Sequence, residues 1–283
     1  MKEKVVIFGA GGSGKKLYEK YQKEDSNIEI VAFADNFKNG TLYNLPILSP
    51  EDLLDYGYDS IIIASVAAGP IREKLLEIGI PAGRVSSSYI EVAAQARDVF
   101  LKRAADEIHR KNLSGAVAEA GVFQGDFAKL INRYFPQKNL YLFDTFTGFD
   151  ERDIEVEEGY EKDPNRGEHF KQTSVELVMS KMPYPEKVII KQGYVPETFA
   201  GLEEKFCFVN LDMDLYQPTL AALEWFWPRM VGGGVILIHD YFDETGTFPN
   251  LKKAVIRFTE ENHICSIPIG DDLSIALLKS ETI

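Results

Sequence analysis

Two acidic sequences in the second half of the chain follow apolar runs and could together hold a metal ion. Asp212 and Asp214 come after FCFVNL, and His239-Asp240 comes after GGGVILI. If both runs are parallel strands, their carboxyl ends meet at the edge of a sheet where α/β proteins bind ligands. Oxygen-rich clusters suit Mg²⁺ or a similar ion, which would lower the pKa of a bound hydroxyl. Asp212 and Asp240 are therefore candidate metal ligands beside His239, although strand-end capping and a buried core imidazole also explain these residue types.

A glycine-containing turn lies earlier in the same half of the chain. Glu119, Gly121 and Gly125 follow the apolar run GAVA, and Asp144 closes the next run, YLFD. Small residues let the backbone approach a ligand, and Glu119 can bond its polar groups. A carboxylate at the position of Asp144 can accept both hydroxyls of a ribose. Together, at the first two strand ends of one domain, these motifs favour an adenosyl ligand.

A second glycine turn opens the chain. Gly9, Gly11 and Gly14 form a GxGxxG sequence between an expected strand and helix, and Asp35 ends the next strand. Such glycines permit a tight turn and let a phosphate approach a helix N-terminus. Two interpretations stay open: a nucleotide-related ligand bound here, or glycines that serve the turn alone.

The elements that position these residues alternate between short apolar runs and amphipathic helices, and they do so twice. This pattern predicts an α/β protein with two doubly wound, Rossmann-like domains. We expect a small domain over 1–91, a connecting helix over 92–112 and a second domain over 113–283. SPEDLLDYG is expected to be a capped helix, RVSSSYI an extended piece, and HICSIPIG with DDLSIALLKS an antiparallel hairpin. The apolar face of the connecting helix is expected to comprise Val92, Ala96, Val99, Phe100, Ala104 and Ile108.

Between Asp150 and Glu176 the sequence has no clean periodicity. The stretch is too long for an ordinary connection, and it mixes Tyr160, His169 and Phe170 with many charges. It is expected to be an active-site lid or a disordered insertion.

The whole-chain properties restrict the class of partner. A net charge of −13 argues against nucleic acid, because phosphate binding needs a basic face. No apolar run is long enough for a membrane span, and no signal peptide is recognisable. Cys207 and Cys265 lie in apolar surroundings and suit reduced, packed thiols. We therefore expect a cytoplasmic protein with a small-molecule substrate, and self-association into a homo-oligomer stays open.

Several of these motifs resemble, in order and spacing, the macrocin O-methyltransferase (TylF/MycF) family. The resemblance covers residues 113–279 and includes VAEAGVFQGDFA, YLFDTFTGFDERD, GYVPETF and LDMDLYQPTLAALEWFWPRMVGGGVILIHDY. It implies a class I fold that uses S-adenosylmethionine (SAM). It also implies methyl transfer to a hydroxyl, commonly of a sugar, with Mg²⁺.

The resemblance assigns roles to individual residues. Glu119 and Gly121 would line the SAM turn, Asp144 would hold the ribose, and Gly193 would lie by the adenine or methionine end. The implied metal positions are Asp212, His239 and Asp240. The macrolide enzymes have two aspartates where this chain has His239-Asp240. Imidazole is a poorer Mg²⁺ ligand than a carboxylate. Two alternatives therefore stay open: the site binds another divalent metal, or Asp212 is catalytic and His239 acts as a general base.

The first part of the chain resembles a different module. VVIFGAGGSGKKLYE and IVAFADN are similar to the small Rossmann domain of bacterial polysaccharide and nucleotide-sugar enzymes. This likeness implies a sugar or nucleotide-sugar substrate. Two other functions compete with methyl transfer: an NAD(P)- or nucleotide-sugar-binding sugar-modifying enzyme, and a non-catalytic nucleotide-sugar sensor.

Overall fold

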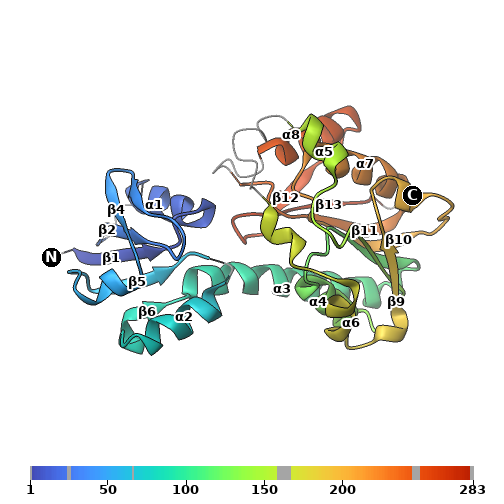
Figure 1. The fold of residues 1–283 in the computed structure, drawn as a ribbon. Helices are drawn as coiled ribbons and strands as arrows, with labels where there is room; N and C mark the ends of the chain where they lie inside the picture. The colour runs from blue at the N-terminus through green and yellow to red at the C-terminus, as the bar shows by residue number, and fades with distance from the viewer. Residues whose placement is uncertain (1, 24–26, 66, 158–166, 244–248, 281–283) are drawn as a thin grey trace. The chain divides into compact units, whose positions relative to one another are not determined.

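The computed structural model describes all residues except 1, 24–26, 66, 158–166, 244–248 and 281–283 (Figure 1). The chain divides into two compact parts. Unit 1 is built from Met1–Gln95, and unit 2 begins at Ala96. Each unit has a sheet of its own, which confirms the predicted α/β class with two doubly wound sheets.

In unit 1, a six-stranded sheet has the order β3-β4-β2-β1-β5-β6. Only β3 is antiparallel to its neighbour, and the other described pairs are parallel. Helices α1 and α2 bury apolar residues in different core clusters, one on each face of the sheet. The bounds are β1 Glu3–Phe8, α1 Gly12–Lys23, β2 Ile28–Ala34, β3 Gly40–Leu42, β4 Leu45–Leu48, β5 Ser60–Ile63, α2 Ala68–Glu77 and β6 Val85–Ser86.

Three local predictions in unit 1 differ from the structure. The predicted helix SPEDLLDYG is only a 3-10 turn over Glu51–Leu54, too short for a regular helix because Gly57 follows it. The hairpin of β3 and β4 was not predicted. In RVSSSYI only Val85–Ser86 is extended, because the serines that follow begin a helix.

In unit 2, a seven-stranded sheet has the order β12-β13-β11-β10-β7-β8-β9. The strands β7 to β11 are mutually parallel, and β13 runs antiparallel to β11 and β12, which confirms the predicted C-terminal hairpin. The central strand β7 has β8 on one side and β10 on the other. The strand order therefore reverses between β7 and β10, the position where open α/β sheets bind ligands. The bounds are β7 Ala116–Ala120, β8 Leu140–Asp144, β9 Val188–Gln192, β10 Phe206–Leu211, β11 Met230–Ile238, β12 Ser266–Pro268 and β13 Ile275–Leu278.

Helices cover both faces of this sheet (Figure 1). On one face, α3 (Ser88–Arg110), α4 (Asp126–Tyr134) and α6 (Val175–Ser180) pack against the strands. On the other face, α7 (Tyr216–Phe226) and α8 (Pro249–Glu261) do so. Burial on both faces explains why the strands are continuous apolar runs rather than alternating ones. Among the described residues, no helix is long and apolar enough to cross a membrane.

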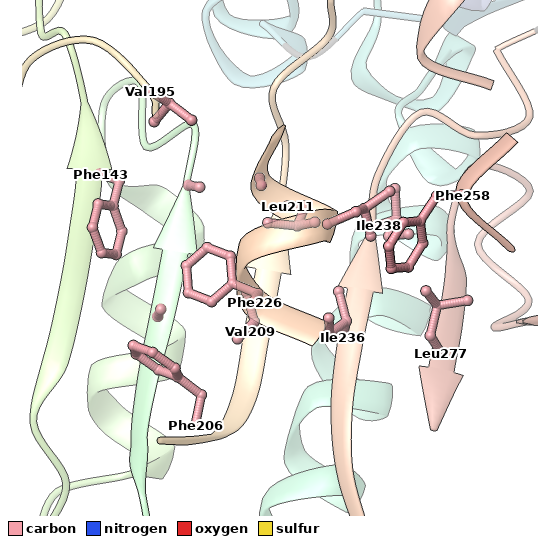
Figure 2. Close-up of a cluster of buried hydrophobic side chains, with 14 of the residues drawn as sticks. Phe143, Val195, Phe206, Val209, Leu211, Phe226, Ile236, Ile238, Phe258 and Leu277 are labelled. Carbon is pink, nitrogen blue, oxygen red and sulfur yellow. The ribbon is translucent and has the colours of Figure 1, made fainter. Parts of the chain in front are cut away.

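The core on the α7 side is rich in aromatic rings. Figure 2 shows Phe206 and Val209 of β10 beside Phe226 of α7. The ring centroids of Phe206 and Phe226 are 5.1 Å apart in an edge-to-face arrangement, a geometry that stabilises aromatic pairs beyond their burial alone. This packing fixes β10, whose carboxyl end carries Asp212.

The connecting helix α3 differs from its prediction at both ends and on its face. It spans Ser88–Arg110 rather than 92–112, because Ser87 accepts the first helical hydrogen bond from Glu91. Val92 and Val99, expected on the apolar face, are 61% and 54% exposed. Ile108 is buried as predicted, and Phe100 and Ala104 are partly buried against the same core, but the most deeply buried residues also include Leu101 and Ala105, which the predicted face omitted.

The two cysteines also differ from each other. Cys207 is buried as predicted, whereas Cys265 is exposed. The expectation that both thiols are packed is therefore wrong for Cys265.

The carboxyl ends of the central strands lie level with one another at one edge of the sheet. Asp212 N donates to Ala120 O over 2.9 Å, and His239 N donates to Leu211 O over 2.9 Å. Gly121 has a φ of +81°, and a Cβ atom there would lie 1.9 Å from Asp212 O. Glycine is thus required for β7 and β10 to approach each other at this edge.

We expect Gly121→Ala to lower the free energy of unfolding by about 2 kcal/mol or more. Alanine would be strained at this positive φ, and its methyl group would clash with the backbone oxygen of Asp212. Gly69→Ala in α2 is the matched control, since Gly69 has open space around it and alanine favours a helix by roughly 0.5 kcal/mol. Urea denaturation measures both variants. Equal stability of the two would contradict the required close approach.

Candidate functional site

Three side chains predicted as metal ligands lie together at the ends of β10 and β11. One ligand atom each from Asp212, His239 and Asp240 lies within 4.8 Å of the others. His239 Nε2 is 3.5 Å from Asp240 Oδ1. This strand-end cluster comprises these three residues, and its donor set is one imidazole nitrogen and two carboxylates.

Arg97 of α3 reaches this cluster. Its Nη2 atom donates to Asp212 Oδ2 over 3.0 Å and to Asn210 Oδ1 over 3.1 Å. The guanidinium lies over the ring of Phe127, 4.0 Å from its centroid. Burial alone would raise the pKa of Asp212, but the effects of neighbouring His239 and of the Arg97 guanidinium outweigh it and hold this pKa below its ordinary value. Arg97 thus keeps Asp212 ionised.

The sequence analysis missed Arg97 as a site residue. It precedes Leu101 and Ala105 at intervals of four residues, so it lies on the buried row of α3. A charged residue aligned with that row was the signal that could have identified it. The predicted face did not include the row through Leu101 and Ala105, so Arg97 was not considered.

Glu119 lies beneath the cluster and is 2% exposed. Asn210 Nδ2 donates to its Oε1 atom over 2.8 Å. Its Oε2 atom is buried and has no hydrogen-bond partner among the described residues. Burial, reinforced by the charge of Asp212, raises the pKa of Glu119 well above its ordinary value. Glu119 thus offers an unused polar atom beside the glycine turn.

Asp214 adds a further carboxyl group to the same edge, close to Asp240 of the cluster. Burial raises the pKa of Asp214 well above its ordinary value, and the nearby charges of Asp240 and Asp212 add to this effect. The pKa of Asp240 is raised as well, by burial first and then by Asp212 and Asp243, although His239 and Arg97 oppose the shift. The edge therefore carries more negative charge than its side chains neutralise, which favours a bound cation.

Asp144 fastens the glycine turn. Its Oδ2 atom accepts hydrogen bonds from the backbone N–H groups of Val122 and Phe123 over 2.6 and 3.0 Å. Its Oδ1 atom accepts from Phe146 N over 2.6 Å. Asp144 therefore shapes the backbone around Gly121, in addition to any contact with a ribose.

The remaining glycines of the predicted cofactor site border this turn. Gly125 lies at the N-cap of α4 with a φ of +78°. Gly193 follows β9, and its N–H donates to Asp144 O over 2.9 Å. The structure thus gathers Glu119, Gly121, Gly125, Asp144 and Gly193 around the ends of β7, β8 and β9.

Part of the predicted lid over 150–176 is described, and Tyr160 lies outside the described residues. The described part includes α5 (Glu151–Val156), whose Ile154 packs with Phe149 and Phe170 against Leu215. Phe170 meets the rings of Phe123 and Phe149 at centroid distances of 5.3 and 5.0 Å. Gln124 Nε2 also donates to Gln172 O over 2.8 Å. These contacts place the stretch over the turn, as a cover would be.

A cavity of about 780 Å³ lies within this cover. No residue of the strand-end cluster lines it, so the cavity is separate from the candidate metal ligands. Its lining is rich in carboxylates: Thr147, Phe149, Asp150, Glu151, Ile154, Glu155, Glu157, Gly167, Glu168 and Lys171.

The glycine turn of unit 1 has a comparable construction. Asp35 Oδ2 accepts from Ala10 N over 2.9 Å, as Asp144 does from the turn of unit 2. A Cβ atom on Gly9 would lie 2.6 Å from Ala64 O, and one on Gly14 would lie 1.8 Å from Gly9 O. Packing thus accounts for these two glycines, whereas Gly11 has open space around it. A nucleotide-related ligand at this turn stays a prediction.

Comparison with known families matches two parts of the chain. A family model described as macrocin-O-methyltransferase (TylF) matches residues 86–271. A second, described as C2185-like, N-terminal, matches residues 1–86. No curated protein shows significant sequence similarity to the chain.

Among solved structures, the O-methyltransferase NovP is similar with a TM-score of 0.54 and 20% identity, over 66% of this chain and 80% of NovP. This likeness shows the fold. TomG from Streptomyces achromogenes, an O-methyltransferase of tomaymycin synthesis solved with SAM, has a TM-score of 0.44 and 16% identity, over 69% and 91%. CalS11, a TDP-rhamnose 3'-O-methyltransferase of calicheamicin biosynthesis, has a TM-score of 0.43 and 18% identity, over 75% and 92%.

We expect Arg97→Met to lower the free energy of unfolding by roughly 1 to 3 kcal/mol, because it leaves Asp212 without its charged hydrogen bond. Arg103→Met is the matched control on the same helix, since the Arg103–Asp106 pair is exposed to solvent and such pairs contribute less than about 1 kcal/mol. Urea denaturation of both variants measures the difference. An Arg97 variant as stable as the Arg103 variant would contradict this role.

Proposed function

The chain belongs to the macrocin O-methyltransferase (TylF) family, and from that premise we propose that it methylates a hydroxyl group of a sugar with a divalent cation beside the acceptor. Family membership makes it a SAM-dependent O-methyltransferase and confirms the resemblance found in the sequence. It also argues against the two competing functions, an NAD(P)- or nucleotide-sugar-binding sugar-modifying enzyme and a non-catalytic nucleotide-sugar sensor. The sugar, the cation and the individual site residues are the proposed part.

The residues around the glycine turn fit SAM. When bound, SAM supplies a methyl group on a positively charged sulfonium. Gly121 and Gly125 leave the backbone open to close approach by a ligand. The buried, unpartnered Oε2 atom of Glu119 supports a hydrogen bond with a polar group of the ligand, because a buried polar atom left unpaired is costly. Asp144 retains lone pairs for ribose hydroxyls beside its backbone bonds.

The strand-end cluster fits a divalent cation. The observation that carries this part of the proposal is the convergence of one imidazole and two carboxylates within 4.8 Å, on an edge where burial raises the pKa of Asp214 and of Asp240. Asp212, His239 and Asp240 would hold the ion, and there it would lower the pKa of an acceptor hydroxyl. The imidazole favours a borderline metal such as Mn²⁺, Co²⁺ or Zn²⁺ over Mg²⁺.

The chain's own residues have three tasks in this reaction. Arg97 keeps the carboxylate of Asp212 ionised and fixed in direction. His239 offers Nε2 as a ligand of the cation, or, in an enzyme that works without a cation, as the base that takes a proton from the acceptor hydroxyl. The sheet edge holds donor and acceptor side by side, and such alignment contributes much of the rate in a displacement at a methyl group.

We expect Asp144→Ala to weaken binding of S-adenosylhomocysteine (SAH) by roughly 1 to 3 kcal/mol, through loss of hydrogen bonds to the ribose. Asp35→Ala is the matched control, because Asp35 accepts the same kind of backbone bond in unit 1. Isothermal titration calorimetry on folded protein measures both affinities. Weakening by Asp35→Ala instead would move the SAM site to unit 1.

We expect chelation with EDTA to abolish methyl transfer while SAH still binds, because the cation acts on the acceptor and not on the donor. Asp240→Asn should match the chelated enzyme, and added Mn²⁺ should restore activity to the wild type alone. Full activity in enzyme shown to be metal-free by elemental analysis would contradict the cation. It would favour His239 as the base, with a rate that falls as pH drops through the imidazole pKa, about 6.5 when unperturbed.

A further inference from the structure

His239 is connected to two buried residues that the proposed reaction does not use. His239 Nδ1 lies 2.8 Å from Ser274 Oγ. Ser274 Oγ in turn donates to Asp271 Oδ2 over 2.6 Å. Ser274 and Asp271 are 1% and 3% exposed, so water does not compete for these bonds. The three side chains form a continuous line from the strand-end cluster into the protein.

Sheet register creates this line. Ile238, the last residue of β11, pairs antiparallel with Ile275, the first residue of β13. The next positions outward are His239 and Ser274, which therefore lie opposite each other. Asp271 closes the turn before β13, where its Oδ1 atom accepts from Ser274 N over 2.7 Å and from Leu273 N over 3.0 Å.

The direction of the hydrogen bonds follows from counting protons. A serine hydroxyl has one hydrogen, and an ionised carboxylate can only accept. Because Ser274 gives its hydrogen to Asp271, its oxygen can only accept from His239. The hydrogen between Ser274 and His239 must therefore belong to Nδ1 of the ring.

We infer that Asp271 and Ser274 are positioning residues that hold neutral His239 in the tautomer protonated on Nδ1. The lone pair of Nε2 then faces the carboxylates of the cluster, 3.5 Å from Asp240 Oδ1. This is the form of imidazole that binds a metal through Nε2 or accepts a proton there. The role of Nε2 as a metal ligand or proton acceptor rests on the proposed function. The assignment of the tautomer rests on the hydrogen bonds alone.

The tautomer can be measured directly. Two-dimensional ¹H–¹⁵N spectra that correlate ring hydrogens with both ring nitrogens separate the two forms. The spectra are recorded on metal-free enzyme at a pH about two units above the ordinary imidazole pKa of about 6.5. A His239→Asn spectrum assigns the signals. We expect wild-type His239 to be protonated on Nδ1, and protonation on Nε2 would overturn the inference.

Asp271→Asn provides a sharper test, because it reverses the direction of the hydrogen bonds between residues 271, 274 and 239 while the side chain keeps its shape. The two backbone N–H groups keep the amide oxygen at the position of Oδ1, so the amide nitrogen faces Ser274 and donates to it. Ser274 must then donate to His239, and the ring proton moves to Nε2. Ser274→Ala removes the constraint, and the ratio of the tautomers should fall at least about fivefold.

His109 serves as an internal control in all these spectra. Its Nε2 atom lies 2.9 Å from the carbonyl oxygen of Tyr134, which can only accept. His109 should therefore remain protonated on Nε2 in every variant. An Asp271→Asn protein that is folded by circular dichroism but keeps its proton on Nδ1 would refute the positioning role.

A second readout connects the tautomer to the proposed cation. Mn²⁺ affinity, measured by calorimetry without substrate, should fall 10- to 100-fold in Ser274→Ala, the range typical of residues that orient a metal-bound histidine. If the tautomer changes and Mn²⁺ affinity does not, the positioning stands and the proposed metal ligation by His239 fails. If neither changes, the inference itself fails.

Discussion

Negative charge buried at the carboxyl ends of β7, β10 and β11 constrains unit 2 more than any other feature. Glu119, Asp212, Asp214 and Asp240 lie near one another at the sheet edge, where solvent screens them poorly. Carboxylates so placed cannot all remain ionised without compensation. The raised pKa values of Glu119 and Asp214 favour protonation of these two. Arg97 compensates Asp212 directly, and Asp240 is left beside the imidazole of His239. A positive partner near Asp240 would stabilise this arrangement further, and Arg97 links the charges of the site to the packing of α3.

The sequence predicted the alternation of strands and helices because burial on both faces of a parallel sheet makes each strand a continuous apolar run. It also predicted that Asp212 and His239 would be neighbours, since consecutive parallel strands end at the same edge. It could not predict the full width of the buried face of α3. Two adjacent rows, one through Phe100 and Ala104 and one through Leu101 and Ala105, both pack against the sheet, and only the first belonged to the predicted face. Arg97 lies on the second row, which explains why it was missed.

The strand-end aspartates illustrate a limit of motif reasoning. Asp35 and Asp144 were both interpreted as acids that hold a ribose. In each unit the carboxylate also accepts backbone N–H groups from the glycine turn of the preceding strand, Ala10 in unit 1 and Val122 in unit 2. An acid at this position is thus required by the turn whether or not a ligand binds. The glycines carry a similar ambiguity, because Gly9, Gly14 and Gly121 each relieve a backbone contact. Among these motif residues, Gly11 and the unpartnered oxygen of Glu119 have no such internal explanation, and they indicate ligands more specifically than the motifs as a whole.

His239 shows how one substitution within a family motif changes what its surroundings must do. A carboxylate presents acceptor atoms in either orientation and needs no particular proton arrangement. An imidazole is a ligand or a base only through the nitrogen that lacks a hydrogen, so its tautomer has to be fixed by the other nitrogen. The pairing of β11 with β13 brings Ser274 to that nitrogen, and Asp271 fixes the direction of the serine hydroxyl. The histidine also replaces a negative charge with a neutral donor at an edge already crowded with carboxylates. His239 thus reduces the negative charge at this edge, and Ser274 and Asp271 fix the tautomer that such a histidine requires. The difference from the macrolide enzymes and the buried polar residues behind it therefore belong together.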